Sequence, residues 1–192
     1  ISKALLKDYK DQQKQPLVLF DGDDASLNIG LEGKNENIMS SQLYFEAANV
    51  TDSTVTMRLN AANGGHLDFN YKLIPNSYMV DFSVKAEGLQ NFFSPSVKTM
   101  SIDWKQRARQ MEKGYTFEQR YTSLTYKPVD DSFDYLSETK DEKETIPEVL
   151  DWVAFKNQYF SCVFIAEQNF EKATLESKME QKGSGYMKNY QA

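Results

Sequence analysis

The single histidine and the single cysteine are the residues of this 192-residue chain best suited to acid–base or nucleophilic chemistry. Any Ser-His-Asp triad would have to use His66, which directly follows the Gly64-Gly65 pair. We interpret His66 as an exposed turn residue at the start of a strand. Cys162 lies far from it in sequence, and we interpret it as a small buried residue. One cysteine excludes an intrachain disulfide and, with one histidine, a zinc cluster.

Acidic clusters are the next candidates for chemistry. Asp21-Gly22-Asp23-Asp24 resembles the first part of a calcium loop, but its order is wrong and the distant bidentate Glu is missing. We interpret Asp130-Asp131 and Asp141-Glu142 as solvated loop charges. No phosphate-loop, dinucleotide or nucleophile-elbow motif is present. We therefore predict no catalytic residue, no metal and no cofactor, although carboxylate pairs of the glycosidase kind depend on the fold and stay open.

Composition narrows the classes of partner. The formal net charge of −6 argues against nucleic acid and against anionic lipid, since both recruit Lys and Arg clusters. No apolar run approaches the roughly 20 residues of a membrane span, and Cys162 to Ala166 is the longest clear cluster. No signal peptide is visible, and the chain starts at Ile1 without Met, so we expect a piece of something longer.

The elements that would position these residues are mostly strands. Apolar and polar residues alternate with period two, which indicates half-buried strands. Asn63-Gly64-Gly65 and Pro75-Asn76-Ser77 stand between alternating runs and predict hairpins. We therefore expect antiparallel sheets packed face to face. The alternating runs are 26–31, 54–60, 66–73, 80–86, 100–104, 124–126, 133–135 and 173–179.

Helix is scarce in this pattern. Trp104 to Glu118 is the best helix candidate, because Trp104, Ala108 and Met111 fall at helical spacing. Lys3 to Asp8 is ambiguous between helix and strand. The charged stretch 137–148 is predicted to be a solvated loop, with room for one helical turn.

Trp152 to Glu167 is the most apolar and aromatic stretch, and it does not alternate cleanly. It fits a strand buried on both faces, and it equally fits a helix with i, i+3, i+4 spacing. Its β-branched and aromatic content favours strand. A long strand with a bulge near Gln158 to Ser161 would account for the change of phase.

The sequence W-V-A-F-K-N-Q-Y-F at 152–160 resembles a segment of the large periplasmic domain of YidC-type membrane protein insertases. An ordered series of weaker matches extends over most of the chain, and 101–104 and 118–122 resemble the Bacteroidetes-type version. We expect the motif residues to be mainly structural. They are Trp152, Phe155, Lys156, Gln158, Tyr159 and Phe160.

The resemblance implies an antiparallel β-supersandwich similar to galactose mutarotases, with one or two short helices. It implies a single periplasmic domain over 1–192, and we expect a fragment that lacks terminal strands and a linking helix. It places the parent protein in the bacterial inner membrane, with this domain on the periplasmic face. The family's insertase machinery lies in transmembrane helices that this sequence does not contain, so no insertase active residue is carried over.

Two function classes remain. The leading one is a non-enzymatic insertase domain that contacts Sec translocon accessory subunits or nascent membrane proteins. Phe92 and Phe93, which precede Ser94-Pro95 in an expected loop, are the predicted partner contacts. The alternative is a carbohydrate-binding or mutarotase-like protein, in which Trp104 or Trp152 would stack on a sugar. A lone turn histidine makes mutarotase chemistry the weaker version.

Overall fold

The computed structural model describes residues 1–93 and 98–192 and consists mainly of antiparallel strands. It divides into two compact units, of which unit 1 is Ile1–Leu27 with Asp103–Ala192 and unit 2 is Asn28–Ile102. The predicted fold class, mostly β with short helices, is confirmed. The single domain expected over 1–192 stays a prediction, and the predicted Ser94-Pro95 loop lies outside the described residues.

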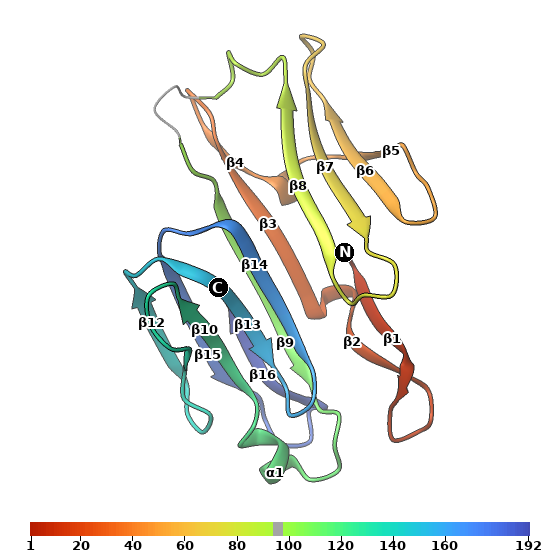
Figure 1. Ribbon diagram of the computed structural model, residues 1–192, viewed down its shortest axis with the longest axis vertical. Coiled ribbons are helices and arrows are strands. Elements are labelled where there is room, and N and C mark those ends of the chain that lie inside the picture. The colour runs from red at the N-terminus through yellow and green to blue at the C-terminus, as the bar shows by residue number, and fades with distance from the viewer. Residues whose placement is uncertain (94–97) are drawn as a thin grey trace. The chain divides into compact units, whose positions relative to one another are not determined.

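The ribbon in Figure 1 is coloured along the chain, from red at the N-terminus to blue at the C-terminus. Within the described residues 1–93 and 98–192, one α-helix, α1 (Tyr115–Gln119), and two 3-10 turns, η1 (Gly22–Asp24) and η2 (Ser40–Gln42), accompany the strands. The strands are β1 (Lys3–Lys10), β2 (Pro16–Asp21), β3 (Ala25–Glu32), β4 (Asn37–Met39), β5 (Glu46–Ala48), β6 (Thr54–Asn60), β7 (His66–Leu73), β8 (Val80–Glu87), β9 (Ser101–Arg109), β10 (Ser123–Pro128), β11 (Asp134–Tyr135), β12 (Glu142–Ile146), β13 (Leu150–Lys156), β14 (Ser161–Phe170), β15 (Ala173–Met179) and β16 (Tyr186–Gln191).

Unit 2 is built on the sheet β5-β6-β7-β8, whose last three strands run side by side in Figure 1. Both predicted hairpins are present, and the turns place Gly64 and Asn76 at φ of 83° and 55°. Alternate side chains along a strand point to opposite faces of the sheet. Because apolar and polar residues alternate in these strands, the apolar side chains share one face. That face contributes to a core of Ile29, Leu31, Leu67, Phe69 and Leu89.

Unit 1 contains two sheets that share one core. The first has the order β11-β10-β13-β14, and the second contains β12-β15-β16-β9. Phe155 of the first sheet stacks on Trp104 and Tyr190 of the second, with ring centroids 3.7 and 5.0 Å apart. The remaining pair, β1 and β2, forms a separate hairpin. Across residues 1–93 and 98–192, no helix has the length and hydropathy needed to cross a bilayer.

The helix predicted for Trp104 to Glu118 is wrong. Residues up to Arg109 belong to β9, which pairs with β16, and only Tyr115–Gln119 is helical. The reason is that a spacing of four is even, so Trp104 and Ala108 also share one face of a strand. Gln106, between them, is buried on that same face.

Two further expectations are corrected. The stretch expected to be a solvated loop contains β12, which pairs with β15 at the end of its sheet, where charged side chains are tolerated. The aromatic stretch after Trp152 is not one strand with a bulge near Gln158. It is the hairpin β13–β14, turned at Gln158 and Tyr159. The ambiguous Lys3 to Asp8 segment is part of strand β1.

Candidate functional site

A groove of about 470 Å³ lies on the β11-β10-β13-β14 sheet of unit 1. Its lining residues alternate along the strands with residues of the core: Leu124 and Phe155 face the core, whereas Thr125 and Ala154 line the groove. Because neighbours along a strand point to opposite faces, the groove lies on the face turned away from the core. We call this hollow the outer groove.

Small side chains form the floor of the outer groove. Ser123, Thr125 and Ala154 line it and are only 2%, 8% and 5% exposed, although they lie on the outer face. Longer side chains, among them Tyr135, Trp152 and Lys156, line the same groove. The two floor hydroxyls are 3.3 Å apart, within hydrogen-bond distance of each other.

Aromatic and aliphatic side chains form the walls. Phe133 and Tyr135 stand at the β11 side and are 61% and 51% exposed. Trp152 and Val163 line the opposite part, and Val163 is 46% exposed. Exposed apolar side chains grouped around a hollow are typical of a surface that binds a partner or ligand.

One cation and one anion line the outer groove. Lys156 and Glu138 both belong to the lining, and no ion pair joins Lys156 to any acid in residues 1–93 and 98–192. The backbone of Lys156 is fixed, because its carbonyl accepts a hydrogen bond from Tyr190 Oη at 3.1 Å. Lys156 therefore has a fixed backbone, and its ammonium group is available to bind an anion in the outer groove.

The motif residues from the sequence divide between core and surface. Phe155 is buried in the core, and Trp152 and Lys156 line the outer groove. Gln158 and Tyr159 form the turn between β13 and β14, and Tyr159 is 67% exposed. In the same hairpin, the Phe160 ring packs edge-on against Tyr9 at 5.1 Å. Their role in the function stays a prediction.

Phe92 and Phe93, the predicted partner contacts, pack against the core of unit 2 and contact each other edge to face. The carbonyl of Phe92 accepts a hydrogen bond from Lys34 N, so the segment folds back onto the sheet end. Both side chains are half-buried. Their contact with a partner stays a prediction.

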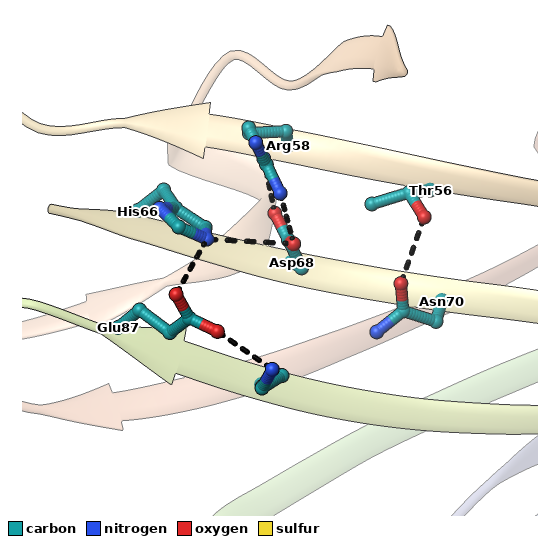
Figure 2. Close-up of polar contacts among 7 residues, drawn as sticks. Thr56, Arg58, His66, Asp68, Asn70 and Glu87 are labelled. Atoms are coloured by element: carbon teal, nitrogen blue, oxygen red, sulfur yellow. Dashed lines mark hydrogen bonds and ion pairs between the residues drawn. The ribbon is translucent and has the colours of Figure 1, made fainter. Parts of the chain in front are cut away.

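His66 lies at the start of β7, as predicted, but its side chain is only 20% exposed. Figure 2 shows it pointing toward Asp68 and Glu87, with Nε2 3.7 and 3.6 Å from their carboxylate oxygens. Arg58 forms two hydrogen bonds to Asp68, from Nε and Nη2, at 2.7 and 2.6 Å. The Arg58 hydrogen bonds hold the pKa of Asp68 below its ordinary value. The histidine therefore lies in a cluster of paired charges on the polar face of the sheet.

The other two residues considered for chemistry, Asp24 and Cys162, are in environments that oppose reactivity. Asp24 of the acidic turn is buried and accepts hydrogen bonds from Tyr186 Oη and Arg109 Nε at 2.7 and 2.6 Å. Burial raises the pKa of the Cys162 thiol, which opposes formation of the thiolate. Within residues 1–93 and 98–192, no three His, Cys, Asp or Glu side chains form a group that could hold a metal ion.

The sequence interpretation missed the outer groove except for residues of the Trp152 motif. Its floor comes from β10 and β13, and its walls come from β13, β14, β11 and the residues Phe133 and Glu138 on either side of β11; the register of these strands brings them together. A signal was present in the alternation of the aromatic residues Phe133 and Tyr135, of which Tyr135 belongs to β11 and Phe133 directly precedes that strand. Without the pairing of β11 with β10, the face of the sheet on which they lie could not be assigned.

Antiparallel sheets packed around a shared aromatic core are the architecture of a β-sandwich. The chain belongs to the YidC periplasmic domain family, whose model matches residues 1–192. A protein of Phocaeicola vulgatus called "Membrane protein insertase YidC" is 60% identical over the whole chain, and proteins of the same name from Bacteroides fragilis and Porphyromonas gingivalis are 51% and 37% identical over 100% and 98% of it. The chain spans 31%, 31% and 30% of the length of these three relatives.

Proposed function

We propose that this chain is the non-catalytic periplasmic part of a membrane protein insertase, and that it holds segments of membrane proteins through the outer groove. Family membership supports the assignment to an insertase, because the relatives carry that name. The observation that carries the groove's role is the pair of exposed aromatic walls, Phe133 and Tyr135, over a floor of small residues. A hollow of this kind accepts apolar side chains of different shapes.

One observation supports the non-catalytic role: burial raises the pKa of the Cys162 thiol, which opposes formation of the nucleophilic thiolate. The periplasmic face of the inner membrane is the proposed location. Contact with Sec translocon accessory subunits is the second part of the proposal, and Phe92 with Phe93 is its proposed contact.

Site-specific photo-crosslinking in cells tests this function. In a chimera, the chain replaces the matching 31% of the Phocaeicola vulgatus relative, with a photoreactive amino acid at Tyr135. Tyr44, 93% exposed and outside the groove lining, is the matched control position. We expect crosslinks from position 135, and not from position 44, to newly made membrane proteins. Equal labelling at both positions, or none at 135, would contradict the groove's role.

The same chimera with the photoreactive group at Phe93 tests the contact with Sec subunits. Crosslinks from position 93 to a Sec subunit would support that contact, and their absence would remove it without affecting the groove.

A carbohydrate ligand is the second candidate, and one observation favours it. Aromatic side chains beside buried hydroxyls, here Tyr135 beside Ser123 and Thr125, also suit a sugar ring, which stacks its apolar face and hydrogen-bonds its edge. Binding to a panel of glycans, with Tyr135→Ala as the control variant, separates the two candidates. A saturable sugar signal that this variant abolishes would favour carbohydrate over polypeptide.

A further inference from the structure

We propose that the outer groove receives an extended polypeptide segment, which adds to β14 as an antiparallel fifth strand and places alternate side chains in the groove. The proposal rests on the function proposed above and specifies the form in which a segment is held. Three observations support it: the direction of the backbone groups of β14, the side chains that line the groove, and the register between β13 and β14.

The first observation concerns the direction of the backbone groups of β14, which is the last strand of its sheet. Asn157 N donates to Phe160 O at 2.8 Å, so these two residues form a hydrogen-bonded pair at the hairpin end. Hydrogen-bonded and non-bonded pairs alternate along an antiparallel ladder. The pairs that Ser161, Val163 and Ile165 make with β13 are therefore non-bonded, and their N–H and C=O groups point away from the sheet.

These outward groups are available. Over residues 1–93 and 98–192, no backbone hydrogen bond from another segment reaches positions 161, 163 or 165. An edge strand in this state is a template for pairing with another chain.

The second observation is that the same residues face the groove with their side chains. Ser161 and Val163 line it, and Ile165 lies two residues further on the same face, 47% exposed. Backbone direction and side-chain direction both repeat every two residues. A segment paired with this edge would therefore hold every second side chain on the groove side. A polypeptide matches such alternating donors and acceptors, and a sugar does not.

The usable edge is short. Ile165 pairs with Trp152 and Phe170 pairs with Leu150, so β14 has extra residues between them and bulges there. Asn169 within the bulge has φ of 63°. Such a bulge ends regular pairing and limits uncontrolled edge-to-edge association. The recognition unit is therefore the stretch from Ser161 to Ile165.

The side chains around this stretch define the chemistry of the segment. The apolar side chains of Val163 and Ile165 favour apolar residues at the opposite positions of the bound segment. Lys156 is the register partner of Ser161, lines the groove and has no ion pair within the described ranges 1–93 and 98–192, so an acidic residue fits beside Ser161. For an antiparallel segment, the pattern from its N-terminus is apolar-x-apolar-x-acidic.

Fluorescence anisotropy with a labelled nine-residue peptide tests the geometry. The peptide carries leucine, valine and glutamate at its third, fifth and seventh positions and threonine or serine elsewhere. In an antiparallel strand, the fifth residue points its N–H at β14 and the sixth points its N–H away. We expect N-methylation of the fifth residue to weaken binding at least about tenfold, the effect of one lost hydrogen bond, and N-methylation of the sixth to change it less than about twofold.

Variants of the chain test the same hydrogen bond and the charge of the groove from the side of the protein. Val163→Pro removes an outward N–H without breaking the β13 ladder, and Val163→Thr is the control that keeps it; we expect about tenfold weaker binding for the first alone. Lys156→Glu should weaken binding of the glutamate peptide, and a peptide with lysine at the seventh position should recover it. Thermal melts of each variant verify the fold.

The outcomes separate this inference from the proposed function. Tight binding that neither N-methyl group affects would overturn strand addition and leave the groove function standing, and the reverse methylation pattern would overturn the antiparallel arrangement. A dimer of the chain itself that Val163→Pro abolishes would overturn a foreign segment as the occupant. No binding of any peptide would overturn the inference, and the proposed function would fail with it only if the crosslinks from position 135 were also absent.

Discussion

The guanidinium of Arg109 donates from Nε to Oδ2 of Asp24 at 2.6 Å and so joins β9 to the 3-10 turn that follows β2. Tyr186 Oη donates to the other carboxylate oxygen at 2.7 Å, and Asp24 is only 6% exposed. Burial works to raise the pKa of Asp24, but the hydrogen bonds from Tyr186 and Arg109 outweigh it, so the pKa lies below its ordinary value.

Asp24→Asn should therefore lower the free energy of unfolding at pH 7 by about 2 kcal/mol, the effect of losing hydrogen bonds to a charged group. The lowered pKa means that this stabilisation is present above the unfolded value of about 3.9 and is lost as pH falls through the native pKa. Urea titrations at pH 7 and at acid pH measure both effects. Asp23→Asn, at an exposed neighbour, is the control and should change little. Equal losses in the two variants would contradict the assignment.

Lys188 is fully buried, and its ammonium group donates to Ser137 O at 2.7 Å. Burial lowers the pKa of Lys188 to about 8, whereas the unfolded chain keeps this proton to about 10.4. Between these values the unfolded state binds more protons, so the free energy of unfolding should rise by about 2 kcal/mol from pH 7.5 to 9.5. Lys188→Met should lack this rise.

The matched control for this prediction is Lys182→Met, because Lys182 is exposed. The measurement stops below pH 10, since burial raises the pKa of Tyr190 and the unfolded tyrosines would then titrate first. The same slope in the Lys188→Met variant and the wild-type chain would rule out Lys188 as its source.

Phe155 and Tyr159 belong to the same sequence motif but have opposite environments. Phe155 is 2% exposed and stacks between Trp104 and Tyr190, whereas Tyr159 is 67% exposed in a turn. Phe155→Ala should cost about 3–5 kcal/mol of stability by leaving a cavity, and Tyr159→Ala less than about 0.5 kcal/mol. Chemical denaturation of both variants measures these changes in the free energy of unfolding. A large loss of stability in Tyr159→Ala would show that the exposed part of the motif also stabilises the fold.

Arg58 and Asp68 form a two-bond ion pair across β6 and β7, with Asp68 8% exposed. Lys85 and Glu87 form a second pair nearby, but their side chains are 66% and 50% exposed. A double-mutant cycle should find clear coupling for the first pair and none measurable for the second, because solvent screens exposed charges. Equal coupling energies in both cycles would mean that solvent exposure does not determine the strength of these ion pairs.

The alternating runs identified β3, β6, β7 and β8 correctly, and the Gly and Pro turns identified the hairpins β6–β7 and β7–β8. Local pattern was sufficient there because each strand pairs with its neighbour in sequence. It failed at Trp104, where an even spacing fits both a helix and a strand, and only the pairing with β16 selects the strand. It failed also at Gln158, where the apolar run continues through a turn.

The sequence by itself determined the mostly β character, the hairpins of unit 2, the scarcity of catalytic groups and, through the motif at 152–160, the family. Tertiary structure alone decided the outer groove, the partners of Asp24 and His66, and the burial of Lys188. The physical reason is that alternation and turn chemistry act between residues close in sequence. A groove and a buried charge depend instead on the register of strands whose residues lie far apart along the chain.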